Sequence, residues 1–315
     1  MTISARVIAD SISEHKVRIT TLELRYPRFI HAEFMTHRMF SRNASSSRAI
    51  PVERLIQDIL DDTAMPVRWG VANKGMQDGG EMSEFDAALA KREWLEDRDY
   101  MIARVRKAMA RPTKPAKQWI NRKLEPWSHI TVLVTATEWN NFWSLRIHKD
   151  AQPEMRELAI SMFEAMDVSK PFTLLPEQWH LPFITQQDYT DVARHIKNTH
   201  PVAIHLSDAD LYFLGVSLLQ KISIARCARV SYLNHDGSRP SIEADLALYD
   251  RLLAAEPLHA SPAEHQATPD DIKYDAATNT WEWEAPHFHG NFVGWQQYRK
   301  MLVGENVATN RTSGK

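Results

Sequence analysis

The chain has 315 residues, of which 43% are hydrophobic and 25% are charged, enough for one large or two ordinary globular domains with a real core. Its net charge of −2 excludes an overall basic field for long nucleic acid, so any anion binding has to be local. The single cysteine, Cys227, excludes a disulfide framework and fits a cytoplasmic protein. No apolar run approaches 18 residues and the N-terminus lacks a signal-type core, so we expect neither membrane insertion nor secretion.

The first predicted element is a strand over residues 16–26, where apolar and polar positions alternate with one irregularity. It leads into residues 27–51, an apolar run followed by His37, Arg38, several short hydroxyl side chains and Arg48. Cations and hydroxyl groups suit phosphate oxygens and the acceptor edges of heterocycles, which indicates a nucleotide-type ligand. The alternative is an ordinary serine-rich loop with solvated arginines.

Downstream, two apolar stripes with helical spacing predict helices over residues 84–110 and 151–166. Residues 170–207 change to proline, histidine, aromatic and polar residues. The remaining predictions are a helix running into a strand over 208–232, an amphipathic helix over 241–255, an inserted loop or hairpin over 270–285 and a loose tail after 305.

The order His-Arg-x-x-Ser-x-Asn-x-x-Ser-x-Arg, from His37 to Arg48, resembles the signature of the flavin-dependent thymidylate synthases (ThyX type). Two positions depart from the family pattern. Thr36 stands where the family has an arginine, and Ala44-Ser45 replaces a Glu-Gln pair.

A second block is similar to the same family. Arg122, Pro126 and Thr131 follow the order of its Ala-Arg-x-x-Leu-Pro turn and later threonine. The block continues with an Asn-Phe-x-x-Leu-Arg run that ends at Arg146 and with Ala-Gln-Pro-Glu at 151–154.

A third resemblance lies near the C-terminus, although the family carries it upstream of the signature. It consists of Cys-Ala-Arg-Val-Ser-Tyr at 227–232 and His-Ala-Ser-Pro-Ala-Glu-His at 259–265. We infer a circular permutation, which brings His265 within roughly 20 Å of residues 37–48. The chain is then one catalytic domain, 1–315, with a signature half (16–167), a connector (168–207), a permuted half of N-terminal type (208–305) and a loose tail (306–315).

The resemblance implies an α+β fold with a curved antiparallel sheet flanked by helices. It also implies a homo-oligomer, a tetramer as in other family members, with active sites at subunit interfaces. It implies FAD as cofactor, with methylenetetrahydrofolate and NADPH as co-substrates. The leading predicted function is methylation of dUMP to dTMP. We expect no membrane or long nucleic acid as a partner.

The resemblance also implies roles for single residues. Ser46, Arg48, Arg122 and Arg146 match positions that contact the nucleotide, and Arg146 and Ser46 are the predicted catalytic residues. A fixed cation at Arg146 would stabilise negative charge that develops on the pyrimidine ring. The predicted flavin contacts are His37, Arg38, Asn43, Asn141, Ser231 and His265.

Near the C-terminus, Gln296 and Arg299 repeat the Gln-x-x-Arg spacing that is missing before the signature. They are predicted to supply the absent cofactor contacts; the competing interpretation is an amphipathic terminal helix. His287 and His289 lack a carboxylate or thiolate at ligand spacing, so no metal site is predicted.

Glu33 stands where the family has a neutral glutamine, so it is a predicted substrate-binding residue. A carboxylate accepts hydrogen bonds from an exocyclic amine, which leaves methylation or hydroxymethylation of dCMP, or hydroxymethylation of dUMP, as alternatives. A catalytically inactive nucleotide- or single-strand-binding protein is a further alternative. Cys227 lies in a predicted strand and is interpreted as a buried structural thiol, not a nucleophile.

Overall fold

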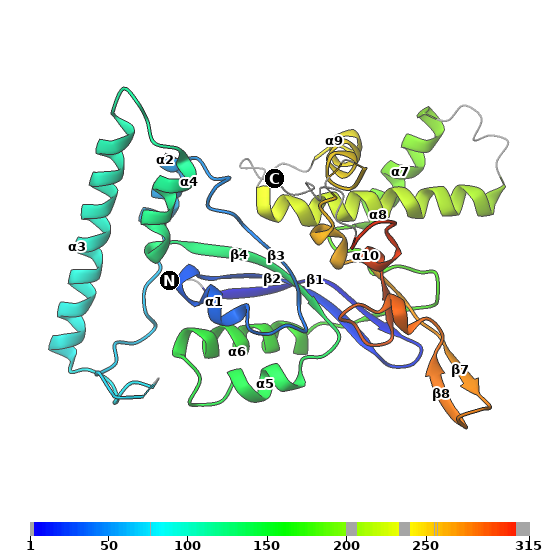
Figure 1. The fold of residues 1–315 in the computed structure, drawn as a ribbon, viewed down its shortest axis with the longest axis horizontal. Helices are drawn as coiled ribbons and strands as arrows, with labels where there is room; N and C mark the ends of the chain where they lie inside the picture. Colours follow the sequence, from blue (N-terminus) through cyan, green and yellow to red (C-terminus); the bar gives the residue numbers. More distant parts are fainter. Residues whose placement is uncertain are drawn as a thin grey trace, which may run out of the picture.

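The computed structural model describes residues 3–75, 77–199, 207–232, 240–254, 256 and 258–306. At its centre is a five-stranded sheet in the order β3-β4-β2-β1-β5 (Figure 1). The strands are β1 (Ser4–Ser13), β2 (Arg18–Pro27), β3 (Ser41–Ala44), β4 (His129–Ala136) and β5 (Phe172–Leu174). The α+β class and the predicted strand β2 are confirmed. The sheet is mixed, however, because β5 returns after a helical crossover and pairs parallel with β1, while the other pairs are antiparallel.

Helices cover both faces of the sheet (Figure 1). The covering helices are α5 (Asn140–Arg146) and α6 (Pro153–Asp167) on one face and α8 (Asp208–Tyr232) on the other. Successive side chains of a strand point to opposite faces, so Val132 and Val134 pack in the same core as Leu158 of α6, while Leu133 packs against Cys227 of α8. The predicted helix over 151–166 is confirmed, and it begins with a proline, whose missing N–H costs nothing in the first turn.

A second apolar cluster lies beyond β4 and joins helices from two stretches of the chain. Its elements are α2 (Val52–Asp61), α3 (Glu84–Met109), α4 (Lys117–Ile120) and the 3-10 helix η2 (Asn121–Trp127). The predicted helix over 84–110 is therefore confirmed. Ser83 begins it as an N-cap, because its hydroxyl accepts a hydrogen bond of 3.1 Å from the backbone N–H of Asp86.

The predicted strand at 227–232 is wrong, since α8 remains helical to Tyr232. A short apolar run does not distinguish a buried strand from a buried helix, and here contacts from other elements decide. Arg226 donates to Asp188 at 2.7 Å and to Asp245 at 2.9 Å, which ties α8 to two further helices. By length and composition residues 208–230 would suffice to cross a membrane, but half of that stretch is buried within the protein.

Residues 168–207, predicted as a connector, contribute regular structure to the fold. They include β5 and α7 (Gln186–Thr199). Val192 and Ile196 of α7 are buried against Leu218 and Ile222 of α8. The segment therefore completes the sheet edge and supports α8, whatever the origin of the gene order.

The C-terminal segment forms small elements around one end of the sheet. They are α9 (Ile242–Tyr249), the π-helical turn Asp250–Ala254, η5 (Ser261–Glu264), β6 (Ala267–Pro269), β7 (Ile272–Asp275), β8 (Thr280–Trp283), η6 (Pro286–Phe288), β9 (Trp295–Gln297) and α10 (Tyr298–Met301). In the N-terminal half, η1 (Arg28–Ile30) and α1 (His31–Phe34) follow β2 directly. The predicted hairpin over 270–285 is confirmed as β7–β8. Residues 307–315 of the predicted tail lie outside the described residues.

Candidate functional site

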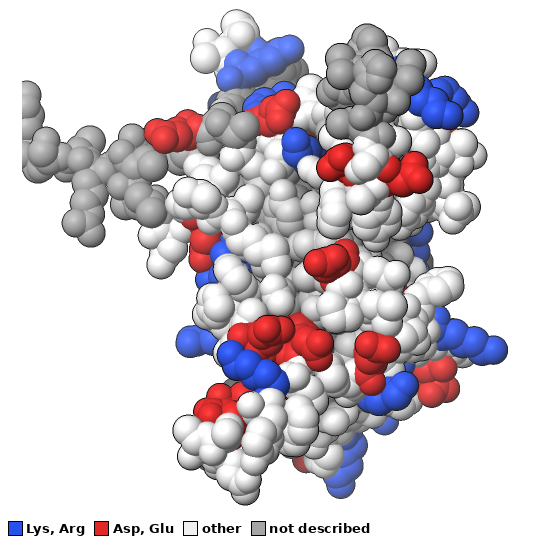
Figure 2. Space-filling model, turned by 90° about the vertical axis from the view of Figure 1, so that its right-hand side faces the viewer, with Lys and Arg blue, Asp and Glu red and all other residues white. Residues whose placement is uncertain are grey.

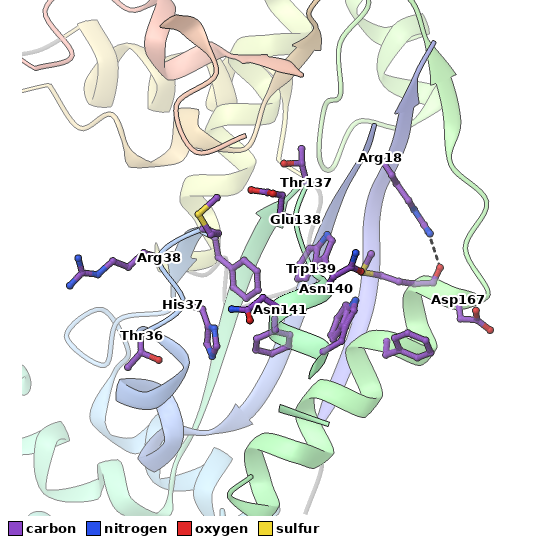
Figure 3. Close-up of a pocket in the computed structure, with 16 residues that line it drawn as sticks. Arg18, Thr36, His37, Arg38, Thr137, Glu138, Trp139, Asn140, Asn141 and Asp167 are labelled. Atoms are coloured by element: carbon purple, nitrogen blue, oxygen red, sulfur yellow. Dashed lines mark hydrogen bonds between the residues drawn. The ribbon is translucent and has the colours of Figure 1, made fainter. Parts of the chain in front are cut away.

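A cavity of about 730 Å³ lies where the turn before β3 meets α5 and α6 (Figure 3). One side is aromatic: the rings of Trp139 and Trp143 lie within 10° of parallel, with centroids 5.4 Å apart. The other side carries His37, Arg38 and Asn141, three of the predicted flavin contacts. We call this the aromatic cavity. Its donors and flat apolar wall suit a planar heterocycle that carries acceptors.

Arg18 closes the far end of the aromatic cavity (Figure 3). Its guanidinium donates two hydrogen bonds, of 2.8 and 2.7 Å, to the carboxylate of Asp10 and a third of 2.8 Å to the carbonyl of Met166. Because these partners are internal, Arg18 is part of the wall. In the sequence Arg18 is simply a polar position of an alternating strand, so the pattern did not predict that it lines a cavity.

Arg146 contacts two other predicted site residues. It is the last residue of α5, and its Nε donates to Nε2 of His37 at 2.8 Å while Nη1 donates to the carboxylate of Glu33. Arg146 and Glu33 also line a second cavity, of about 740 Å³, together with Lys149, Asp150 and other residues of the 149–154 turn. We call this the Arg146 cavity. The cluster of three side chains therefore separates the two cavities.

His37 is neutral at pH 7. Burial, together with the neighbouring cations Arg146 and Arg42, lowers the pKa of its imidazole to about 4. A neutral ring can accept at Nε2, as the contact with Arg146 requires, with its proton on Nδ1. The imidazole also packs edge-on against Phe142, at a centroid distance of 4.8 Å.

Arg42 holds the turn that presents this cluster, a role that sequence reasoning missed. Its Nη1 donates to the carbonyls of Met35 at 2.9 Å and His37 at 3.0 Å. Thr36, which replaces the family's arginine, turns back locally, because its hydroxyl donates to the carbonyl of Glu33 at 2.7 Å. The cation beside this turn is therefore Arg42, at a position that the signature leaves open, and not position 36, where the family has an arginine.

The remaining predicted nucleotide contacts lie in a third place. Arg48 and Arg122 line a hollow of about 480 Å³ with Gln118 and Trp119, which we call the Trp119 hollow. Ser46 shapes the adjoining turn, since its hydroxyl accepts from the backbone N–H of Arg48 at 3.3 Å. As the described residues define them, the three cavities share no lining residue.

Two predicted flavin contacts are buried on the α8 face of the sheet and do not line the aromatic cavity. Asn43 donates to the carbonyl of Cys227 at 3.4 Å, and His265 is fully buried. His265 bonds Thr135 at 2.8 Å, and Thr135 pairs with Ser41 of the signature strand. The expected proximity of His265 to residues 37–48 is confirmed; the permutation itself stays a prediction.

Residues 7–171 match the Thy1 family, described as "Thymidylate synthase complementing protein". The chain belongs to the Thy1 family. No curated protein matches it. Among solved structures it is similar to the UMP/dUMP methylase PolB from Streptomyces cacaoi, bound with 5-Br UMP or with 5-Br dUMP. The two matches have TM-scores of 0.45 and 0.44 at 17% and 16% identity, and cover 52% of this chain and 88% and 90% of PolB.

The C-terminal segment of this Thy1 protein lies outside the family match but touches the signature strand. Gln297 donates from its side-chain amide to the hydroxyl of Ser41 at 3.1 Å and to the carbonyl of Glu264 at 3.0 Å. The predicted residues beside it have other partners: Gln296 donates to Asp270 at 2.8 Å, and Arg299 donates to Glu264 and Glu305. In this structure Gln297, and not Gln296 or Arg299, bonds the signature strand.

The interpretation of Cys227 as a structural thiol agrees with its surroundings. Cys227 is fully buried in α8, and burial raises the pKa of its thiol well above the ordinary range. Its sulfur accepts from the side-chain amide of Gln266 at 3.3 Å. The backbone of Ser231 lies in α8, but its side chain lies outside the described residues.

Proposed function

We propose that this Thy1 protein is a cytoplasmic enzyme that methylates dUMP to dTMP, with FAD as cofactor, methylenetetrahydrofolate as carbon donor and NADPH as reductant. Family membership supports the reaction class. The structural observation that carries the proposal is Arg146, a guanidinium fixed by Glu33 and His37 at the boundary of two cavities. A cation held in advance stabilises charge developing on a substrate without reorganising during the reaction.

The residues of the aromatic cavity fit FAD by their chemistry. Trp139 and Trp143 offer a flat apolar wall to a planar ring, and Asn141 can donate to or accept from its polar edge. Arg38 is exposed at the mouth, where a cation can pair with phosphate. When bound, FAD would supply the hydride and carry the one-carbon unit.

Arg48 and Arg122 are the proposed phosphate grip for the nucleotide, and Arg146 is the proposed partner of its ring. Since they line separate cavities of one chain, a complete site requires a second copy, in a homo-oligomer such as a tetramer. Arg146 would orient the pyrimidine and stabilise negative charge on it. The buried Cys227, whose thiol stays protonated, takes no part in this scheme.

A second candidate, modification of dCMP with a methyl or hydroxymethyl product, is favoured by one observation. Glu33 lines the Arg146 cavity beside Arg146, so a carboxylate and a guanidinium face the same space. Such a pair can accept from the exocyclic amine of cytosine while donating to its ring acceptors. The N3–H and carbonyls of uracil fit the same pair, so the natural base has to be measured.

The deciding experiment is anaerobic. The purified protein should show a flavin absorbance band; after reduction with NADPH, adding methylenetetrahydrofolate and dUMP should oxidise the flavin and yield dTMP. dCMP and UMP serve as comparison nucleotides, and the faster of dUMP and dCMP identifies the base. A colourless protein that binds nucleotide and leaves added FAD unused would instead support the inactive binding protein.

A further inference from the structure

One surface carries a run of cations without ionic partners. It consists of residues 111–123 together with Arg48, and its basic side chains are Arg48, Arg111, Lys114, Lys117, Arg122 and Lys123. All six residues are exposed, and none forms an ion pair with any described residue. We call this surface the cationic ledge. It carries more cations than the two arginines proposed to bind the phosphate of a nucleotide monophosphate.

The ledge is local. Residues 111–123 include no Asp or Glu, and the nearest acid along the chain, Glu125, accepts a hydrogen bond of 2.7 Å from Ser47. Figure 2 shows the right-hand side of the molecule, opposite the side on which α4 lies in Figure 1, and there acidic and basic side chains are intermingled. Residues 111–123 thus carry five basic and no acidic side chains in a protein whose net charge is −2.

An unpartnered aromatic ring lies within the ledge. The indole of Trp119 is 69% exposed, lines the Trp119 hollow beside Arg48 and Arg122, and contacts no other described ring. Burying this ring against another planar ring would remove apolar surface from water. An exposed indole between cations presents both groups that a strand of bases and phosphates needs.

The ledge rests on a fixed base. Asn121 is fully buried, and its side-chain amide donates to the carbonyls of Ser47 at 2.7 Å and Ile50 at 2.9 Å. Lys117 donates to the carbonyl of Ala49 at 3.2 Å. These bonds fix the segment carrying Arg48 against α4, so the relative positions of the hollow and the ring do not depend on a ligand.

We infer that the cationic ledge binds a single strand of nucleic acid, with a base stacked on Trp119 and backbone phosphates on the surrounding cations. Base stacking on aromatic rings combined with a positive groove is the general mode of binding to single strands. From Arg111 to Lys117 the chain can span at most about 20 Å, more than one nucleotide but too little for a long duplex track. The ledge shares Arg48 and Arg122 with the proposed nucleotide site, so the test changes only Trp119 and cations outside that pair.

The test is fluorescence anisotropy with a labelled 12-nucleotide oligothymidylate, titrated with the full chain at several salt concentrations. Trp119→Ala should weaken binding about 5- to 150-fold, whereas Trp119→Phe should keep most of it. Replacing Lys114 and Lys123 together by glutamine should reduce the slope of log affinity against log salt by about 1.4. Arg48 and Arg122 stay unchanged because they belong to the proposed nucleotide site.

Matched controls come from the opposite end of the molecule. Trp281 on β8 is 67% exposed, so Trp281→Ala removes an equally accessible indole. A double replacement of the exposed Lys170 and Lys273 by glutamine removes the same charge elsewhere. Both controls should bind the oligonucleotide like the unaltered protein.

Four results would overturn the inference: no binding at low salt, equal losses in the controls, equal competition by poly-glutamate, or ledge variants that dissociate the oligomer in sedimentation. The third would indicate a general polyanion surface, and the fourth a contact between subunits. Because the oligonucleotide is bound without flavin or folate, failure of the methylation assay leaves these outcomes interpretable.

Discussion

At the scale of single residues, the environment of Arg146 distinguishes this chain from the family pattern. Glu33 is a carboxylate where a neutral glutamine is expected, and it bonds Arg146 directly. His37, neutral because burial lowers its pKa to about 4, supplies a second acceptor without adding charge. Together they hold the guanidinium in one orientation while Glu33 offsets its charge.

Glu33→Gln tests this arrangement, because it keeps an acceptor for Arg146 and removes only the negative charge. A less neutralised Arg146 should bind an anionic ring more tightly. We expect affinity for 5-fluoro-dUMP above pH 8, where its ring ionises, to rise about tenfold, or ~1.4 kcal/mol. Isothermal titration at pH 7 and pH 9 measures this directly.

The matched control is Asp150→Asn, which removes the same charge from the same cavity without a bond to Arg146. It should change the affinity by less than about twofold. If both substitutions act alike, or Glu33→Gln leaves the pH dependence unchanged, Glu33 has no particular influence on Arg146.

At the scale of elements, a buried line of polar side chains crosses three strands. Ser11 of β1 bonds His180 at 2.9 Å, His180 bonds Thr21 of β2 at 2.8 Å, Thr21 bonds Thr135 of β4 at 2.7 Å, and Thr135 bonds His265. Both imidazoles are almost fully buried. The line joins the sheet to residues 180 and 265, which lie far from it in sequence.

This line makes stability dependent on pH. Burial lowers the pKa of both His180 and His265 to about 3, while in the unfolded chain each keeps a pKa near 6.5. Below pH 6.5 the unfolded chain therefore binds protons that the folded chain does not, and the free energy of unfolding falls as the pH drops from 6.5 toward 3. At pH 5 each histidine should cost roughly 2 kcal/mol relative to pH 7, which urea unfolding at the two pH values would measure.

His265→Gln should lower stability at pH 7 but remove about half of this pH-dependent difference. The control is His148→Gln, because His148 is exposed and, among the described residues, forms an ion pair only with Asp150, at 3.5 Å. Equal pH dependence in the His265 variant and the unaltered protein would show that these imidazoles are not the source.

At the scale of the whole molecule, the proposed nucleotide contacts are divided between the Trp119 hollow and the Arg146 cavity. If one copy supplies the phosphate grip and another supplies Arg146, two inactive variants can complement each other. Arg48→Ala and Arg146→Ala should each lose most of the activity, and a mixture refolded or coexpressed together should regain part of it. Activity assays on the separated and mixed variants measure this.

Each variant alone, at the same total concentration, is the control for that mixture, and sedimentation must show one oligomeric state throughout. Activity that stays absent from mixed oligomers would place both arginines in one subunit's site or exclude a shared site. If the unaltered protein sediments as a monomer and is fully active, a site shared between subunits is likewise excluded.

Several elements could be predicted because their signals are local. The helices that became α3 and α6 have apolar stripes, and α3 begins at a capping serine while α6 begins at a proline. The β7–β8 hairpin has strand-like runs around a turn. The parallel β5 and the helical end of α8 could not be predicted, because partners far along the chain decide both. For α8, the ion pairs of Arg226 with Asp188 and Asp245 fix a run that is ambiguous by itself.

The sequence by itself determined the Thy1 membership and the identity of the chemical groups, since the order of residues from His37 to Arg48 and from Arg122 to Arg146 survives without any knowledge of packing. Only the tertiary structure decided which of those groups meet. It joined Glu33, His37 and Arg146, put His265 inside the sheet's polar line and left Arg48 with Trp119 on the ledge. The reason is physical: side-chain chemistry is local to a residue, whereas burial, charge pairing and proximity are set by strands and helices distant in the chain.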